Sequence, residues 1–237
     1  MQKKFHPWGD AGRRIGSARF AGAIGRDRPF RVGLLVPMCG GAGIWGPSSI
    51  ASAQTAAAEL NRCDGVMGRR VELVPIDAAV ENLNALSYRV HEMIELGAID
   101  AIVGMHISAV RQHMTKIVAG RVPYVYTPLF EGGEASEGVF TIGETPGQQL
   151  GPAIEWITLR HKVKRWAMIG NDYVWPRVSH HYAKDVIRTA HAALVLERYL
   201  PFGAADHVKL IECLRRCRAD GLILSLVGQD AIDFNRA

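Results

Sequence analysis

Residues 31–62 read RVGLLVPMCGGAGIWGPSSIASAQTAAAELNR, and this stretch decides the fold class. Its first seven residues, RVGLLVP, form a short apolar run that is typical of a parallel strand buried on both faces. A glycine-rich loop follows, and the alanine-rich stretch 48–62 then has high helix propensity, with Ser48 or Ser49 available to cap its start. The order strand, loop, helix is the first unit of an α/β fold.

The same order is repeated along the rest of the chain. Further strands are expected at 71–76, 101–104, 122–127, 139–142, 165–169, 194–199 and 221–226. Helices are expected between them at 81–96, 109–119, 146–161, 178–192, 207–218 and 229–237. This alternation predicts doubly wound parallel sheets flanked by helices. We divide the chain into a basic tail rich in Gly, Ala and Arg (1–30), an N-terminal lobe (31–145) and a C-terminal lobe (146–237).

The composition is that of a globular protein, with 237 residues, 48% of them hydrophobic and 22% charged. Much of the excess behind the net charge of +5 lies in the first 31 residues, so it belongs largely to the tail. The remainder carries no basic stripe with interleaved aromatic residues, and we expect no direct nucleic-acid partner. No apolar window is long enough to span a membrane. The tail has no secretory h-region, so the chain as written is expected in the cytoplasm, or in the periplasm or at the cell surface if the true start carries a leader.

Metals and cofactors are not expected. The four cysteines have no regular spacing and are interpreted as reduced thiols. His106 and His113 have no third metal ligand near them. The loop at 37–47 contains neither GxGxxG nor a Gly-Lys-Ser/Thr sequence, which argues against a nucleotide. No spacing identifies a nucleophile with its base, so the chain is not expected to be an enzyme. A nucleotide-dependent doubly wound enzyme is the alternative reading.

The candidate site residues follow the strands, because ligands of open parallel sheets bind beyond the carboxyl ends of the strands. Aromatic walls with a few hydroxyl groups suit a small neutral or zwitterionic ligand. Ser108 could cap a helix, offer its hydroxyl to a ligand, or do both. The candidates are Trp45, His106, Ser108, Tyr126 and Thr127 in the N-terminal lobe and Tyr173 and Trp175 in the C-terminal lobe.

Four stretches together carry a resemblance to a known family: RVGLLVP…GIWGPSSIASAQTAAAELN, VGMHISAVRQHM, YVYTPLFEGGE and IGNDYVWPRVSHHYA. This set is similar to the type I periplasmic binding proteins, in the branch that binds branched-chain amino acids, amides and urea. The resemblance implies two lobes that close on a ligand. It places Trp45, Ser108, Tyr126 and Thr127 on the first lobe's side, and either Tyr173 or Trp175 on the second. The sequence SLVGQ, which contains Ser225 and Gly228, resembles a further contact loop of the second lobe.

The function implied by this resemblance is capture of a small amide, urea or amino acid. The protein would then engage an ABC permease for import, or a cytoplasmic regulatory protein for sensing. Members of the family continue beyond the position that corresponds to Ala237. The second lobe is therefore expected to be incomplete, and a fragment that binds nothing is a further alternative.

Overall fold

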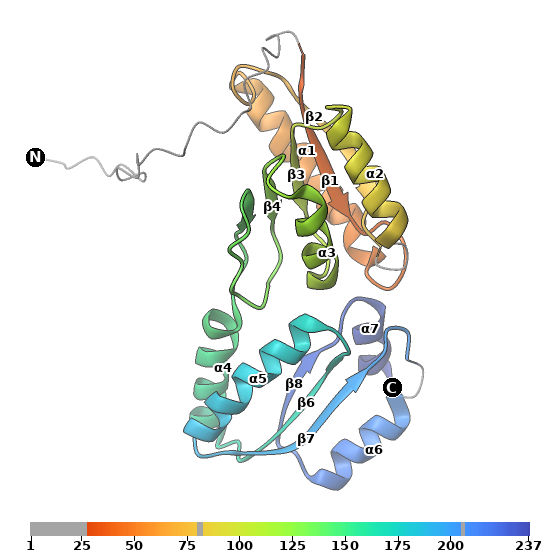
Figure 1. Ribbon diagram of the computed structural model, residues 1–237. Coiled ribbons are helices and arrows are strands. Elements are labelled where there is room, and N and C mark those ends of the chain that lie inside the picture. The colour runs from red at the N-terminus through yellow and green to blue at the C-terminus, as the bar shows by residue number, and fades with distance from the viewer. Residues whose placement is uncertain (1–27, 80–82, 205–206) are drawn as a thin grey trace, which may run out of the picture.

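The computed structural model describes residues 28–79, 83–204 and 207–237, which form two lobes (Figure 1). The elements of the first lobe are β1 (Phe30–Val36), η1 (Gly43–Trp45), α1 (Gly46–Arg62), β2 (Val71–Asp77), α2 (Leu83–Glu95), β3 (Ala101–Gly104), α3 (Ser108–Val118), β4 (Tyr124–Tyr126) and β5 (Val139–Thr141). Those of the second are α4 (Pro146–His161), β6 (Arg165–Asn171), α5 (Val174–Thr189), β7 (Ala193–Leu200), α6 (His207–Cys217), β8 (Gly221–Ser225) and α7 (Gln229–Arg236). The tail predicted for 1–30 lies outside the described residues up to residue 27.

The first lobe is built on a parallel sheet with the strand order β2-β1-β3-β4-β5. Leu35, Ile76 and Ile102 point from this sheet into a core that α2 and α3 cover with Val90 and Met114. Helix α1 packs against β1 and β2 (Figure 1). Pro75 is tolerated in β2 because this strand lies at the edge of the sheet.

The second lobe has a smaller parallel sheet in the described residues, with the order β7-β6-β8. Its central strand β6 is buried from Trp166 to Asn171, as expected for a strand that is covered on both faces. Ile154 of α4 and Ile187 of α5 pack on one side of it, and Phe234 of α7 belongs to a separate cluster with Ile169. The expected α/β class, with two lobes and parallel sheets flanked by helices, is confirmed.

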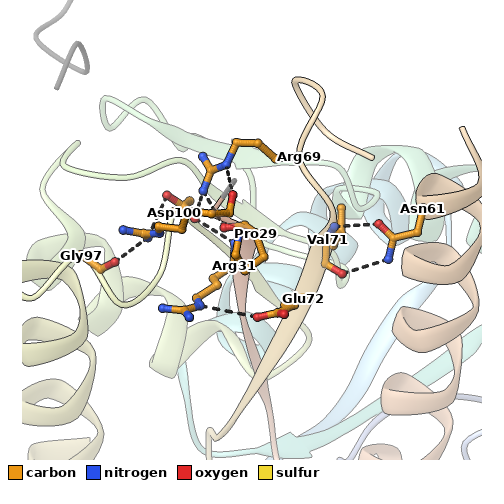
Figure 2. A network of polar contacts seen from close by, with 9 residues as sticks. Pro29, Arg31, Asn61, Arg69, Val71, Glu72, Gly97 and Asp100 are labelled. Atoms are coloured by element: carbon orange, nitrogen blue, oxygen red, sulfur yellow. Dashed lines mark hydrogen bonds and ion pairs between the residues drawn. The ribbon is translucent and has the colours of Figure 1, made fainter. Parts of the chain in front are cut away.

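A polar network holds the start of the first sheet at the edge away from the second lobe (Figure 2). The Asp100 carboxylate accepts hydrogen bonds from the backbone N–H of Arg31 (2.8 Å) and from the buried guanidinium of Arg69 (2.9 Å). Asn61 pairs with both backbone groups of Val71, which ties the end of α1 to the start of β2. The end of the sheet at which these strands begin is therefore occupied by structural contacts.

The expected strands all form, whereas three predictions at helix starts are wrong. Neither Ser48 nor Ser49 caps α1, which begins at Gly46 after a 3-10 turn, with Pro47 in its first turn. Ser108 is not an N-cap, because Ile107 occupies that position and Ser108 is the first helical residue. Helix α5 begins at Val174 and not at 178, since Pro176 is tolerated in a first turn.

Candidate ligand-binding cleft between the lobes

A cavity of about 320 Å³ lies between the lobes, beyond the carboxyl ends of the strands. Both lobes contribute to its lining, which is mostly apolar and aromatic. The lining residues are Trp45, Met105, His106, Ile107, Ser108, Tyr126, Pro128, Leu129, Tyr173, Trp175, Leu226 and Val227. A wider hollow of about 1000 Å³ lies beside α1 and the loop that enters β2, at the opposite edge of the first sheet. The rule that ligands bind at the carboxyl ends favours the smaller cavity.

His106 follows β3 and is fully buried in the wall of this cavity. Burial, together with the charge of Arg111, lowers the pKa of His106 to about 4. The ring is therefore neutral at pH 7. Its Nδ1 lies 3.2 Å from the carbonyl oxygen of Ile107, and its Nε2 lies 2.9 Å from the hydroxyl of Tyr124. Because a carbonyl can only accept, Nδ1 carries the proton and Tyr124 donates to Nε2. Both ring nitrogens are thus used inside the protein.

Ser108 and Tyr126 bring hydroxyl groups to the cavity from α3 and β4. The Tyr126 hydroxyl donates to the carbonyl oxygen of His106 at 2.8 Å. Ser108 Oγ lies 3.4 Å from Tyr126 Oη, and because the phenolic proton is already used, Ser108 is the donor of this pair. Burial raises the pKa of Tyr126 above its usual value, so the phenol is neutral at pH 7.

The second lobe contributes Tyr173 and Trp175, and the sequence alone did not indicate which of the two faces the cleft. Tyr173 and Trp175 line the cavity together, with their ring centroids 6.4 Å apart, and both pack against the core of the first lobe. Tyr173 also contacts Phe202, at 5.4 Å between ring centroids. Asp172, in contrast, pairs with Arg177 at 2.6 Å. Both aromatic residues, and not one of them, face the cleft.

Three candidate residues lie outside the lining of this cavity. Thr127 donates its hydroxyl to the carbonyl oxygen of Gly104 (3.1 Å). Ser225 is buried in the second lobe, with its Oγ 3.1 Å from Nε2 of His180. Gly228 faces the loop at Gly41. These contacts are intramolecular, and a ligand-binding role for the three residues stays a prediction.

The lobes touch through the segment after β8. Val227 is buried in the core of the first lobe, although it belongs to the second by sequence. The backbone N–H of Gln229 donates to the carbonyl oxygen of Gly41 at 3.0 Å. Gly228 has a positive φ of 57°, and a Cβ at this position would lie 2.0 Å from the same oxygen. This contact, which we call the Gly41 latch, holds the two lobes together beside the cavity.

The sequence analysis missed a buried ion cluster behind Tyr126. Arg111 of α3 pairs with Glu131 and Glu134, and the exposed fractions of the three side chains are 3%, 7% and 8%. The guanidinium carbon also lies 5.5 Å from the centroid of the Tyr126 ring. The available signal was the sequence EGGE, in which two glutamates flank a pair of glycines.

Two other expectations concern metals and membranes. His106 and His113 contact different partners, since His113 pairs with Ser87 at 2.5 Å. In the part of the chain that the structure describes, no cluster of three or more His, Cys, Asp or Glu residues is arranged to hold a metal ion. Within the same residues, every helix is too short or too polar to cross a membrane.

Solved structures with the same two-lobed architecture define the class of fold. A solute-binding protein of an ABC transporter from Rhodopseudomonas palustris BisB5, in complex with 3,4-dihydroxybenzoic acid, matches with a TM-score of 0.72 at 19% identity, over 88% of this chain and 57% of its own. A type 1 periplasmic binding protein from Bordetella pertussis Tohama I gives 0.74 at 18% identity, over 88% and 59%. A fatty acid ABC transporter substrate-binding protein from Thermomonospora curvata gives 0.76 at 15% identity, over 87% and 53%.

The sequence itself matches a family of proteins. Residues 29–237 match the family described as periplasmic binding protein, and the chain therefore belongs to that family. It spans slightly more than half the length of the solved structures to which it is similar. At these low identities, the likeness to the solved structures shows the fold alone.

Proposed function

We propose that this chain forms the ligand-holding part of a solute-binding protein that captures a small amide, urea or amino acid between its lobes, taken as residues 31–145 and 146–237. The observation that carries the proposal is the cavity of about 320 Å³, which Trp45, Ser108 and Tyr126 line from one lobe and Tyr173 and Trp175 from the other. Aromatic walls with a few polar groups are typical of small-molecule sites.

The polar groups of the cavity suit a ligand that carries both a carbonyl and an N–H. Ser108 is the first residue of α3, so the positive end of this helix faces the cavity and favours a ligand oxygen. The Tyr126 hydroxyl donates its hydrogen bond to the backbone carbonyl oxygen of His106, so its own oxygen can accept from a ligand N–H. An amide, urea or an amino acid presents both groups.

The mechanism of such a protein is binding without chemistry. A ligand that touches both lobes favours the closed arrangement by its differential affinity for that state. The closed form would then be recognised by an ABC permease or by a regulatory protein. The Gly41 latch supports this proposal, because the two lobes contact one another there, beside the cavity.

Aromatic acids are a second candidate ligand class. Solved structures of similar fold contain 3,4-dihydroxybenzoic acid and 4-hydroxybenzoate, and the cavity of this chain is also lined by aromatic rings. The two classes differ in charge at pH 7, and this difference allows them to be separated by experiment.

A thermal-shift screen tests the proposal, because a ligand that prefers the native state raises the melting temperature by mass action. The panel contains short amides, urea, amino acids and hydroxybenzoates, with nucleotides as the contrasting class. We expect cooperative unfolding with a melting temperature that rises when amides, urea or amino acids are added. A melting temperature that rises only with hydroxybenzoates would identify aromatic acids as the ligand class. A melting temperature that rises only with nucleotides would refute the proposal.

A further inference from the structure

The buried cluster of Arg111, Glu131 and Glu134 is not required by the fold alone. Each carboxylate pairs with a different terminal nitrogen of the same guanidinium, and all three side chains are more than nine-tenths buried. Burying charges costs several kcal/mol per ion unless they are well paired, and a hydrophobic trio of similar volume often serves stability as well or better. The cost suggests a role for the charges themselves.

The loop after β4 is shaped to bring both carboxylates to one arginine. Gly132 and Gly133 have φ values of 87° and 73°, a backbone conformation that residues with a side chain rarely adopt. The resulting turn lets the residues on either side of the glycine pair, Glu131 and Glu134, reach Arg111.

The cluster carries more negative than positive charge. Arg111 contributes one positive charge and the glutamates two negative charges, so the sum is −1. Glu131 Oε2 is buried and has no hydrogen-bond partner among the described residues, whereas Oε1 accepts from both Arg111 and Gln112. One carboxylate oxygen is therefore uncompensated.

This charge lies directly behind the cavity. The guanidinium stacks on the ring of Tyr126, which lines the cavity, and Glu131 follows Leu129, another lining residue, by two positions. Burial raises the pKa of Tyr126 and of Tyr173, and the charge of Glu131 also raises both, while the charge of Arg111 lowers that of Tyr126. No lysine or arginine lines the cavity in the described part of the chain, and His106 is neutral at pH 7.

We propose that Arg111, Glu131 and Glu134 form an electrostatic filter that selects ligands without net charge over anions of the same shape. The two glutamates occupy the arginine that would otherwise attract an acid, and the surplus negative charge repels one. Glu131 and Glu134 are positioning residues in this account, since they act on the ligand through Arg111 and Tyr126. The proposal rests on the proposed function of the cavity.

Matched pairs of an amide and its acid test the filter: acetamide with acetate, butyramide with butyrate, and benzamide with benzoate. Isothermal titration at pH 7 gives the ratio of the two Kd values in each pair. A unit charge at about 10 Å and an effective dielectric constant of about 20 changes affinity roughly tenfold, so the wild-type protein should prefer the amide by about that factor. Glu131→Gln and Glu134→Gln should each remove most of this preference.

The control is Glu137→Gln, which removes a carboxylate from an exposed position on the same loop and should leave the ratio unchanged. A general loss of structure would weaken both members of a pair, whereas a filter changes their ratio. Acids bound as tightly as amides by the wild type, or ratios unchanged in both glutamate variants that still melt cooperatively, would overturn the filter and leave the proposed function standing. Binding of neither member of any pair would overturn the proposed function and the filter with it.

Discussion

Gly228→Ala should open the lobes without replacing any residue that lines the cavity. Gly228 has φ 57° and ψ −121°, a combination outside the regions open to residues with a Cβ. The added methyl would also lie 2.0 Å from the carbonyl oxygen of Gly41, so one of the two backbones must move. This movement would first break the hydrogen bond from the backbone N–H of Gln229 to the carbonyl oxygen of Gly41.

The size of the effect follows from what the latch holds. The hydrogen bond is worth about 1 kcal/mol and the burial of Val227 in the first lobe about 2 kcal/mol. Losing both would disfavour the closed arrangement by about 3 kcal/mol, which is roughly a hundredfold in the apparent Kd of a ligand that needs the closed form. Partial relaxation keeps one of the two contacts, so the expected range is about fivefold to a hundredfold.

Isothermal titration with the best ligand of the screen measures this loss, and small-angle scattering should show a larger radius of gyration. The matched control is Gly68→Ala, which also places an alanine at a positive φ (72°) but where a Cβ has no other atom within 4 Å. The control should lose some stability but keep its Kd. An unchanged Kd in a cooperatively folded Gly228→Ala protein would refute the role of the latch.

Two further predictions concern stability. Burial lowers the pKa of His106 to about 4, below its unfolded value of 6.5, so the unfolded chain binds a proton first. This residue alone should lower the free energy of unfolding by about 3 kcal/mol as the pH drops from 6.5 to 4, and His180, whose pKa is also lowered to about 4, should add to the fall. Urea unfolding at several pH values checks this, and a flat profile in that window would contradict it. Arg111→Met leaves Glu131 and Glu134 buried without their cation and should cost about 3–5 kcal/mol in the same assay. Wild-type stability of that variant would show that the pairs are not buried as described.

The order of strands and helices along the chain was predictable because the signals for it are local. Apolar runs such as 165–169, bounded by turn residues, identify buried strands whatever lies elsewhere in the sequence. The errors arose where a local signal has two meanings. Pro176 reads as a loop residue but also fits the first turn of a helix, and Ser108 reads as a cap but pairs with Tyr126.

The candidate site was predictable in part for the same reason. Trp45, His106, Ser108, Tyr126 and Tyr173 could be nominated because each lies at or beyond the carboxyl end of a strand, and the structure brings them to one cavity together with Trp175.

Contacts between distant residues could not be predicted in this way. Arg111 meets carboxylates 20 and 23 residues away, and Val227 joins a core whose other members lie mostly more than a hundred residues earlier. Packing within the first lobe creates the Arg111 contacts, and packing of the two lobes against each other creates the contacts of Val227.

The central claim is that one ligand is held by both lobes at once. Its most direct test is isothermal titration of the best ligand of the screen against Ser108→Ala, which alters the first lobe, and Trp175→Ala, which alters the second, with the exposed Trp156→Ala as control. The account predicts that each cavity variant weakens binding by about tenfold or more while the control does not. If one of the two cavity variants weakened binding and the other left the affinity unchanged, the ligand would contact one lobe only, and the claim would be contradicted.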